Sequence, residues 1–248
     1  MSQIESNTGL RTLMALAVAC AIQLPHSVAV AQGGAASERV LEEVIITAQK
    51  REQSILDVGI AVAVASEDDI RQRRIVGVTD ITLFTPNASV KDFIPGLMPI
   101  ITIRGVGLND FNAANNPATG VYIDEVSLSS LALLSSDFYD LERMEVLKGP
   151  QGTLYGRNST AGALNITTAK PHFDGTTGRV SGGLGNYDLA ELEGAVNVPV
   201  NDRFAIRLAG KGIKQGEGFY ENSANDDDIG EREVLMGRAQ ALWAASDS

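Results

Sequence analysis

The segment that decides the fold covers residues 141–171: Leu-Glu-Arg-Met-Glu-Val-Leu-Lys-Gly-Pro-Gln-Gly-Thr-Leu-Tyr-Gly-Arg-Asn-Ser-Thr-Ala-Gly-Ala-Leu-Asn-Ile-Thr-Thr-Ala-Lys-Pro. Two short β-prone runs, 144–147 and 163–168, flank a glycine-rich middle that begins with Gly149-Pro150-Gln151-Gly152. Dense glycine favours sharp backbone reversals. The middle lacks the Gly-Lys-Ser/Thr ending and the helix that a phosphate-binding loop needs. The segment therefore predicts two strands joined by tight turns, not a nucleotide site.

Composition sets broad limits on function. The 248 residues allow one or two domains, and 44% hydrophobic with 21% charged residues is ordinary for a globular chain. The net charge of −11 argues against a nucleic-acid partner, because phosphate binding needs a basic face. We therefore expect no nucleic-acid function. Solubility is the simpler explanation of the acidity, with an acidic recognition function as the alternative.

The N-terminus has the layout of a cleavable secretory signal. Arg11 precedes an apolar stretch over 13–24, and Ala29-Val30-Ala31 precedes Gln32. The apolar stretch is shorter than the roughly twenty residues of a spanning helix. We predict a signal peptide over 1–31. The only cysteine, Cys20, lies within it, so the mature chain would have no disulfide and no cysteine nucleophile.

The part before residue 148 predicts a mixed α+β domain. Alternation over 58–65 indicates a strand. Ser66 followed by three acidic residues predicts a capped short helix, and a second short helix is expected from Thr79 to before Pro86. Further strands are expected over 100–105, 121–128 and 144–147.

After Pro171 the chain alternates between apolar and polar residues. The alternating runs predict about four antiparallel strands, at 179–186, 190–198, 204–208 and 234–243. A short turn at 199–202 and a long polar loop at 215–230 connect them. The pattern suits either a half-buried soluble hairpin or a membrane barrel with lipid outside, and alternation alone does not choose.

One face of these strands carries charge of both signs. Glu191 and Glu193 lie on one strand, and Arg203, Arg207 and Lys211 on the next. Opposite charges on neighbouring strands favour cross-strand pairing. We therefore expect ion pairs between these two strands.

No catalytic or metal-binding set assembles from the sequence. His26 and His172 have no partner at metal-ligand spacing. Asp226-Asp227-Asp228 is similar to the start of a calcium loop, but Gly237 stands where a bidentate Glu is needed. No serine sits in a nucleophile elbow. We expect no enzyme activity, no catalytic residues, no metal site and no cofactor.

Residues 141–171 resemble the plug signature of TonB-dependent outer-membrane receptors. The runs Ile101-Thr102-Ile103-Arg104-Gly105-Val106-Gly107 and Val121-Tyr122-Ile123-Asp124 resemble the same plug, in the same order. The resemblance implies an α+β plug domain followed by antiparallel β-strands of an incomplete transmembrane β-barrel. The implied domains are a signal peptide (1–31), a flexible linker with a TonB box (32–51) and a plug (52–171). Residues 172–248 would form about four strands, the first of a truncated β-barrel.

The resemblance also implies a TonB box, a short segment that the partner protein TonB would engage. Its residues would be Glu43, Val44, Ile45, Ile46, Thr47 and Ala48. The implied mechanism is strand addition, in which an exposed extended segment pairs with the edge of a partner sheet. An ordinary first strand of the domain is the alternative.

Two cations occupy the plug positions that, in the family, lock onto carboxylates of the barrel wall. They are Arg104 and Lys148. Arginine is common at the second position, and a lysine offers a point charge where arginine offers a bidentate fork. We therefore expect a weaker or more easily released lock, with a solvated cation or a surface salt bridge as the alternative.

Three loops match the plug loops that face the outer mouth, at 92–97, 108–117 and 129–136. Their possible ligand-facing residues are Phe93, Asn109, Asp110, Phe111, Asn112, Asn115 and Asn116. Amide and carboxylate groups could contact a solute, while the phenylalanines offer apolar surface. Plain turn chemistry is the alternative for such Asn-rich loops.

The function that the resemblance implies is energised uptake of a bulky scarce solute, of the ferric siderophore, cobalamin or carbohydrate class. The implied partners are TonB, outer-membrane lipid and the small-molecule solute, which could itself be an iron chelate. The expected location is the cell outer membrane, with the plug on the periplasmic side and in the barrel lumen. A plugged barrel has about 22 strands, far more than the residues after Pro171 can form, so we expect a fragment of a longer receptor. The alternative is a self-standing periplasmic plug module that binds TonB without transporting.

Overall fold

The computed structural model describes residues 45–46, 53–92, 98–108, 116–128, 130–218, 220–221 and 228–245. The chain divides into residues Met1–Glu42 and a unit Glu43–Ser248, and every described element belongs to the second. The expected signal peptide lies outside the described residues. No helix among the described residues is long and apolar enough to cross a membrane.

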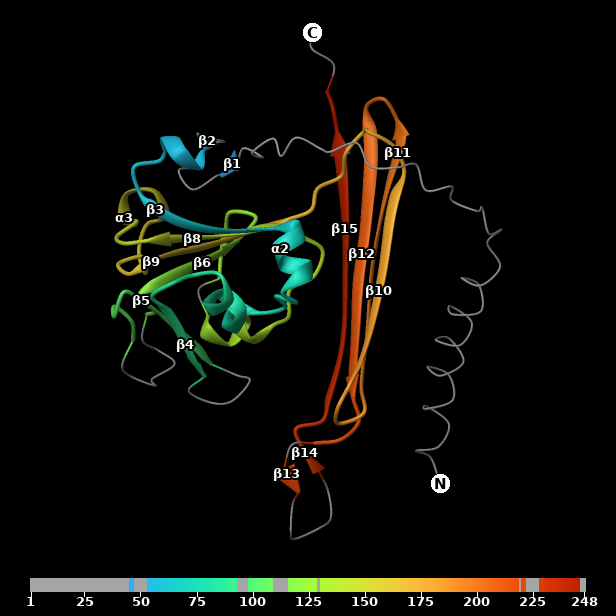
Figure 1. Cartoon of the computed structure of the whole chain (residues 1–248). Coiled ribbons are helices and arrows are strands. Elements are labelled where there is room, and N and C mark those ends of the chain that lie inside the picture. The colour runs from blue at the N-terminus through green and yellow to red at the C-terminus, as the bar shows by residue number, and fades with distance from the viewer. Residues whose placement is uncertain are drawn as a thin grey trace, which may run out of the picture. The chain divides into compact units, whose positions relative to one another are not determined.

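The first part of the unit is built on a five-stranded sheet in the order β3-β8-β9-β6-β7. Its strands are β3 (Ala61–Ser66), β6 (Thr119–Ile123), β7 (Val126–Ser127), β8 (Leu141–Lys148) and β9 (Gly162–Thr168). β8 and β9 are neighbours in this sheet, as residues 141–171 predict (Figure 1). The prediction of turns alone between them was wrong, because residues Gly152–Tyr155 form the short helix α3. All pairs are antiparallel except β6 and β9.

The sheet is buried because its central strands are apolar. Met144 and Val146 of β8 and Leu164 and Ile166 of β9 are fully buried in one hydrophobic core. Helix α2 (Glu67–Gln72) and the 3-10 helices η2 (Val78–Leu83) and η3 (Leu131–Ser135) connect the strands. A separate two-stranded sheet pairs β4 (Ala88–Asp92) with β5 (Pro99–Ile103).

The predicted cap of α2 is confirmed. The Ser66 hydroxyl accepts from the Asp69 N–H at 3.2 Å, and the Asp69 carboxylate accepts from the Ser66 N–H at 3.2 Å. This reciprocal pair satisfies two backbone donors at the helix start. The second predicted helix is the 3-10 helix η2, and its β-branched residues Val78, Thr79 and Ile81 disfavour a longer α-helix.

Three predicted strand boundaries were wrong for local backbone reasons. The first strand begins at Ala61 and not at Val58, because Gly59 and Ile60 form a bend after the 3-10 helix η1 (Ile55–Asp57). β5 ends at Ile103, because Arg104 adopts a φ of 52°. The expected strand over 121–128 is broken by Asp124 and Glu125, which both have positive φ. Left-handed residues end an extended strand and turn the chain.

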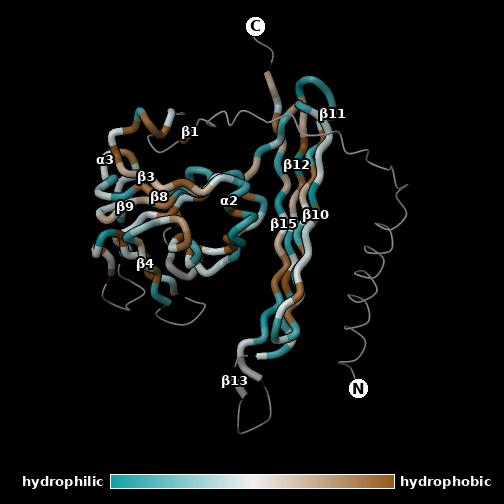
Figure 2. The backbone as a smooth tube through the Cα atoms, viewed as in Figure 1, coloured by the Kyte–Doolittle hydropathy of each residue, from teal (hydrophilic) through white to brown (hydrophobic). Residues whose placement is uncertain are grey.

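The second part is a four-stranded antiparallel sheet, hereafter the wall sheet, in the order β10-β11-β12-β15. Its strands are β10 (Thr177–Gly185), β11 (Leu189–Asn201), β12 (Phe204–Gln215) and β15 (Arg232–Trp243). The four-strand prediction is confirmed, and Figure 2 shows hydrophobic and hydrophilic residues along these strands. The long loop carries a small hairpin of β13 (Tyr220–Glu221) and β14 (Asp228–Ile229). Each outer strand of the wall sheet has one partner among the described strands.

The register confirms one expected cross-strand pair and corrects the others. Glu193 lies opposite Lys211, with 3.9 Å between their charged atoms. Arg207 instead lies opposite Asn197 on one side and Gln240 on the other. The counter-ion of Arg207 therefore comes from outside the wall sheet.

Replacing Gly162 should strongly destabilise the first part. A Cβ there would lie 2.1 Å from the Leu147 carbonyl oxygen, on a residue with a φ of 155°. We expect Gly162→Ala to cost more than about 2 kcal/mol of unfolding free energy. Urea unfolding followed by circular dichroism checks this, with Gly59→Ala as the matched control, because nothing lies within 4 Å of a Cβ at Gly59. Equal unfolding curves for the two variants would contradict the prediction.

Candidate functional site

Asp140 is a buried carboxylate just before β8, and its side chain is fully shielded from solvent. Its φ of 51° is left-handed, a conformation that aspartate tolerates better than most residues. The Asp140 carbonyl accepts from the Ala169 N–H at 3.0 Å, just past the end of β9. Neighbouring strands of the first sheet therefore fix where this carboxylate points.

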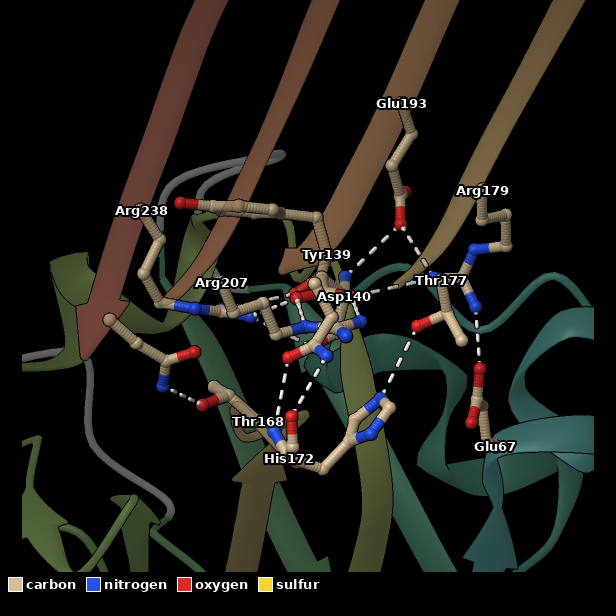
Figure 3. Close-up of polar contacts among 12 residues, drawn as sticks. Glu67, Tyr139, Asp140, Thr168, His172, Thr177, Arg179, Glu193, Arg207 and Arg238 are labelled. Carbon is tan, nitrogen blue, oxygen red and sulfur yellow. Dashed lines mark hydrogen bonds and ion pairs between the residues drawn. The ribbon is translucent and has the colours of Figure 1, made fainter. Parts of the chain in front are cut away.

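Three arginines from three wall strands converge on Asp140 (Figure 3). Arg207 of β12 donates twice, from Nε at 2.9 Å and Nη2 at 2.5 Å. Arg238 of β15 donates from Nη2 at 2.6 Å, and its guanidinium lies 5.1 Å from the centre of the Tyr139 ring. Arg179 of β10 approaches within 3.7 Å. The fork of Arg207 gives this contact a defined geometry as well as charge attraction.

Strand β11, the remaining wall strand, contributes the charged side chain of Glu193. Its carboxylate accepts from the Asp140 N–H at 3.1 Å and lies 3.5 Å from Arg179. Lys211, only 3% exposed, donates to the Phe138 carbonyl at 3.5 Å. Every strand of the wall sheet thus contributes a charged side chain to this site, which we call the Asp140 cluster (Asp140, Arg179, Glu193, Arg207 and Arg238).

Opposite charges and backbone hydrogen bonds satisfy most of the Asp140 cluster, whose three arginines face two carboxylates, while the Nε of Arg238 is buried without a hydrogen-bond partner among the described residues. Arg238 also donates to the Asp140 carbonyl at 2.9 Å. A buried ion pair repays its desolvation only when such extra hydrogen bonds satisfy the remaining donors and acceptors. The arrangement suits a structural anchor between two parts of the chain, because the carboxylate has its partners already.

Further contacts surround the cluster. Glu67 of α2 pairs with Arg179 at 2.6 Å, and Asp137 pairs with Arg232 at 2.8 Å. The Asn197 side chain accepts from the His172 N–H at 3.0 Å and donates to the His172 carbonyl at 3.0 Å. Both parts of the unit therefore meet through polar groups.

No local pattern in the sequence predicts the Asp140 cluster. Asp140 stands in an irregular segment, and its partners lie up to 98 residues away. One indirect signal exists, because Arg207 faces neutral Asn197 and Gln240 in the wall sheet. When a buried-face cation of a sheet has no acidic residue opposite it on either neighbouring strand, its counter-ion is expected to come from another element of the fold.

The expected TonB box is described only at Ile45–Ile46, which form β1 and pair with β2 (Gln53–Ser54). Ile46 is fully buried against Tyr122, Leu147 and Tyr155, in what we call the Ile46 socket. The expectation of an exposed segment is therefore wrong at Ile46. Pairing with a neighbouring strand also fits the alternative of an ordinary first strand.

The two tyrosines of the Ile46 socket are tightly packed. The Tyr122 hydroxyl donates to the Tyr155 carbonyl at 2.5 Å, and the two rings meet edge to face with centres 5.0 Å apart. Burial, with a smaller contribution from the Glu145 carboxylate, raises the pKa of Tyr155 to about 12. Burial also raises the pKa of Tyr122. Both rings therefore stay neutral at physiological pH.

The other expected site residues are not brought together. Arg104 is exposed after β5, and Lys148 is half-buried at the end of β8. Within the described residues, no ion pair is recorded for either cation. The lock stays a prediction.

Most of the expected ligand-facing residues lie outside the described residues, as do four of the TonB-box residues. The ligand-facing group comprises Phe93, Asn109, Asp110, Phe111, Asn112 and Asn115; the box residues are Glu43, Val44, Thr47 and Ala48. Asn116 is described and exposed, and its side-chain oxygen accepts from Asn158 at 3.5 Å. Ligand contact by these loops stays a prediction.

Comparisons with known proteins match this architecture. Residues 54–163 match the family model of the TonB-dependent receptor plug domain. The chain is 27% identical to the pesticin receptor of Yersinia enterocolitica serotype O:8 / biotype 1B, over 89% of this chain and 32% of that protein. It is 27% identical to the vitamin B12 transporter BtuB of Vibrio vulnificus, over 72% of this chain and 28% of that protein.

A solved structure gives the same result. The ferric yersiniabactin uptake receptor FyuA from Yersinia pestis superposes with a TM-score of 0.64 at 25% identity, covering 73% of this chain and 28% of that chain. The fold and the Asp140 cluster thus define a plug domain docked on strands of a receptor wall. Residues 54–163 are a TonB-dependent receptor plug domain, and the chain beyond them is similar to the receptors named above. It spans about a third of the length of the curated relatives it matches.

Removing the charge of Asp140 should weaken the docking of the plug on the wall sheet. Asp140→Asn leaves buried guanidiniums without their counter-ion, a loss worth about 3 to 5 kcal/mol. Denaturant unfolding followed by Trp243, the single tryptophan, measures the change. The control is Asp137→Asn, which breaks a more exposed pair and should cost less than about 1 kcal/mol. Equal effects of the two variants would contradict a special role for Asp140.

Alkaline pH should loosen the Ile46 socket. The pKa of Tyr155 is about 12 in the folded chain and about 10 when unfolded, so the neutral ring stabilises the fold fully below pH 10. This contribution, about 2 kcal/mol, is lost as pH rises from about 10 to about 12. Unfolding free energies across this range should fall less steeply for Tyr155→Phe, which cannot ionise. An identical slope in both proteins would contradict the assignment.

Proposed function

We propose that this chain is the N-terminal part of a receptor for energised uptake of a bulky scarce solute across the outer membrane. The observation that carries the proposal is the docking of a plug domain on wall strands through the Asp140 cluster. A plug that is held against a wall can block a pore until it is displaced or remodelled. External work by the partner would supply that change.

The solute classes that we propose are ferric siderophores and cobalamin, with carbohydrates as a third. Similarity to a vitamin B12 transporter and to a ferric yersiniabactin uptake receptor supports the first two. An iron chelate would then be cargo and not a resident cofactor. The ligand-facing plug loops, including Asn116, would make the first contacts on the plug side.

The proposed partner at the other end is TonB, which would bind residues 43–48 by strand addition. Because Ile46 is buried in the Ile46 socket, the box would leave the socket before it could pair along its whole length. Full burial of an isoleucine contributes about 1.5 to 3 kcal/mol, an amount that partner binding could offset.

The proposed location is the outer membrane, with lipid against one face of the wall sheet. Leu184, Leu208 and Leu235 are exposed on wall strands, and Trp243 is exposed at a strand end. Such residues suit a lipid-facing band with an aromatic residue at its border. The lock by Arg104 and Lys148 would add to the Asp140 cluster, through carboxylates of the wall.

A second candidate function is a self-standing periplasmic plug module that binds TonB without transporting. It is favoured by one observation, the separate hydrophobic core of the first part, built on β8 and β9. In that case the wall strands would have no transport role.

A proline substitution at Val44, within the expected TonB box, tests the proposed function. Val44→Pro removes a backbone donor that strand addition needs, while Val44→Ala keeps it. In cells that depend on this receptor, we expect Val44→Pro to lower the uptake of its solute about tenfold or more, without lowering solute binding at the cell surface. A panel of radiolabelled ferric siderophores and cobalamin provides the readout. Normal uptake by Val44→Pro would contradict the box assignment, and no uptake by the unaltered receptor would favour the module.

A further inference from the structure

Two cavities lie one after the other along β10, where the plug meets the wall sheet. One, of about 220 Å³, is lined by Ser181 and Gly182 of β10 and is called the Ser181 cavity. The other, of about 490 Å³, is lined by Thr177 and Gly178 and is called the Thr177 cavity. Arg179 stands between these positions and lines both.

We interpret one cluster of ionic contacts, shared by the walls of the two cavities, as the divider between them. The Glu67 carboxylate accepts from Arg179 at 2.6 Å and from Arg71 at 2.8 Å, and both arginines line both cavities. Figure 3 shows the Glu67 and Arg179 side chains pointing toward one another. One carboxylate thus holds two guanidiniums together across the gap between α2 and β10.

This divider is more open to solvent than the Asp140 cluster. The side chains of Arg179 and Glu67 are 27% and 43% exposed, whereas that of Asp140 is fully buried. Partly exposed pairs are weakly stabilising and exchange readily with water. Glu67 also directly follows β3, an edge strand of the plug sheet, so displacement of β3 would move the carboxylate.

Cations outnumber carboxylates on the walls of both cavities. The Thr177 cavity is lined by Arg71, Lys170, Arg179 and Arg207 against Glu67 and Glu142. The Ser181 cavity is lined by Arg71, Arg74, Arg179 and Lys211 against Asp140, Glu191 and Glu193. An excess of one sign of charge on the walls of a cleft raises the local concentration of the opposite ion.

We propose that the two cavities form one route for water and small inorganic anions along β10, closed by the contact between Glu67 and Arg179. The route is distinct from the passage of the bulky solute, because the Ser181 cavity is smaller than the roughly 300 Å³ at which ligand pockets begin. When Glu67 releases Arg179, the cavities join and the anion path opens. The proposal goes beyond solute uptake and does not depend on TonB.

Conductance in planar lipid bilayers tests the proposal, with the receptor that carries this chain and potassium chloride as the probe. Glu67→Gln removes the closing carboxylate and leaves every cation in place. We expect it to raise the conductance about two- to fivefold, because a partly exposed ion pair holds the closed state by less than about 1 kcal/mol. Under a salt gradient, the reversal potential should move toward that of chloride.

Two further variants make the result decisive. Arg179→Gln opens the same contact but removes a wall cation, so it should raise the conductance with weaker chloride selectivity. Asp137→Asn breaks the ion pair between Asp137 of the plug and Arg232 of the wall sheet, and neither residue lines either of the two cavities. The receptor with this variant should conduct like the unaltered receptor. Unchanged conductance in both Glu67→Gln and Arg179→Gln would overturn the proposal, as would cation selectivity or an equal rise in Asp137→Asn. The inference rests on the proposed outer-membrane location. Because the assay uses neither solute nor TonB, a loss of uptake through either would leave its outcome unaffected, whereas failure of the unaltered receptor to insert into the bilayer would count against the location itself.

Discussion

The structure depends on one buried carboxylate, that of Asp140, which faces guanidinium groups from three wall strands. A charge without solvent is costly unless opposite charges and hydrogen bonds surround it. The plug supplies the buried acid Asp140 and the wall supplies three arginines. Among these arginines, Glu193 in the wall pairs only with Arg179, so the charges of the wall are not fully matched within it. This mutual requirement explains why the wall sheet carries arginines on its inward face, where an isolated sheet would place neutral residues.

A second contact, of a different kind, lies at the start of the described chain. Ile46 is held by apolar burial, which contributes about 1.5 to 3 kcal/mol and needs no charged partner. Its strand β1 also pairs with β2. The plug therefore holds residues 45–46 by apolar packing, whereas it meets the wall sheet through charged groups.

The sequence predicted the elements well and the long-range site poorly. Residues 141–171 predicted β8 and β9, and Ser66 with Asp69 predicted the cap of α2, because those signals are local. The expected pairing of Arg207 within the wall sheet was wrong, because its partner Asp140 is 67 residues away and outside any periodic pattern. Resemblance supplied Arg104 and Lys148, but it could not supply contacts that depend on how this plug meets this wall. Strand ends at Arg104 and Asp124 were missed because left-handed backbone at non-glycine residues has little sequence signature.

A double-mutant cycle between Asp140 and Arg207 tests the central claim most directly. The unfolding free energies of Asp140→Asn, Arg207→Gln and the double variant would be compared with that of the unaltered chain. If the two side chains hold plug and wall together, the double variant should lose less than the sum of the single losses, with a coupling of about 2 kcal/mol or more. Additive losses, within about 0.5 kcal/mol, would mean that Asp140 and Arg207 do not act on each other and would contradict the account.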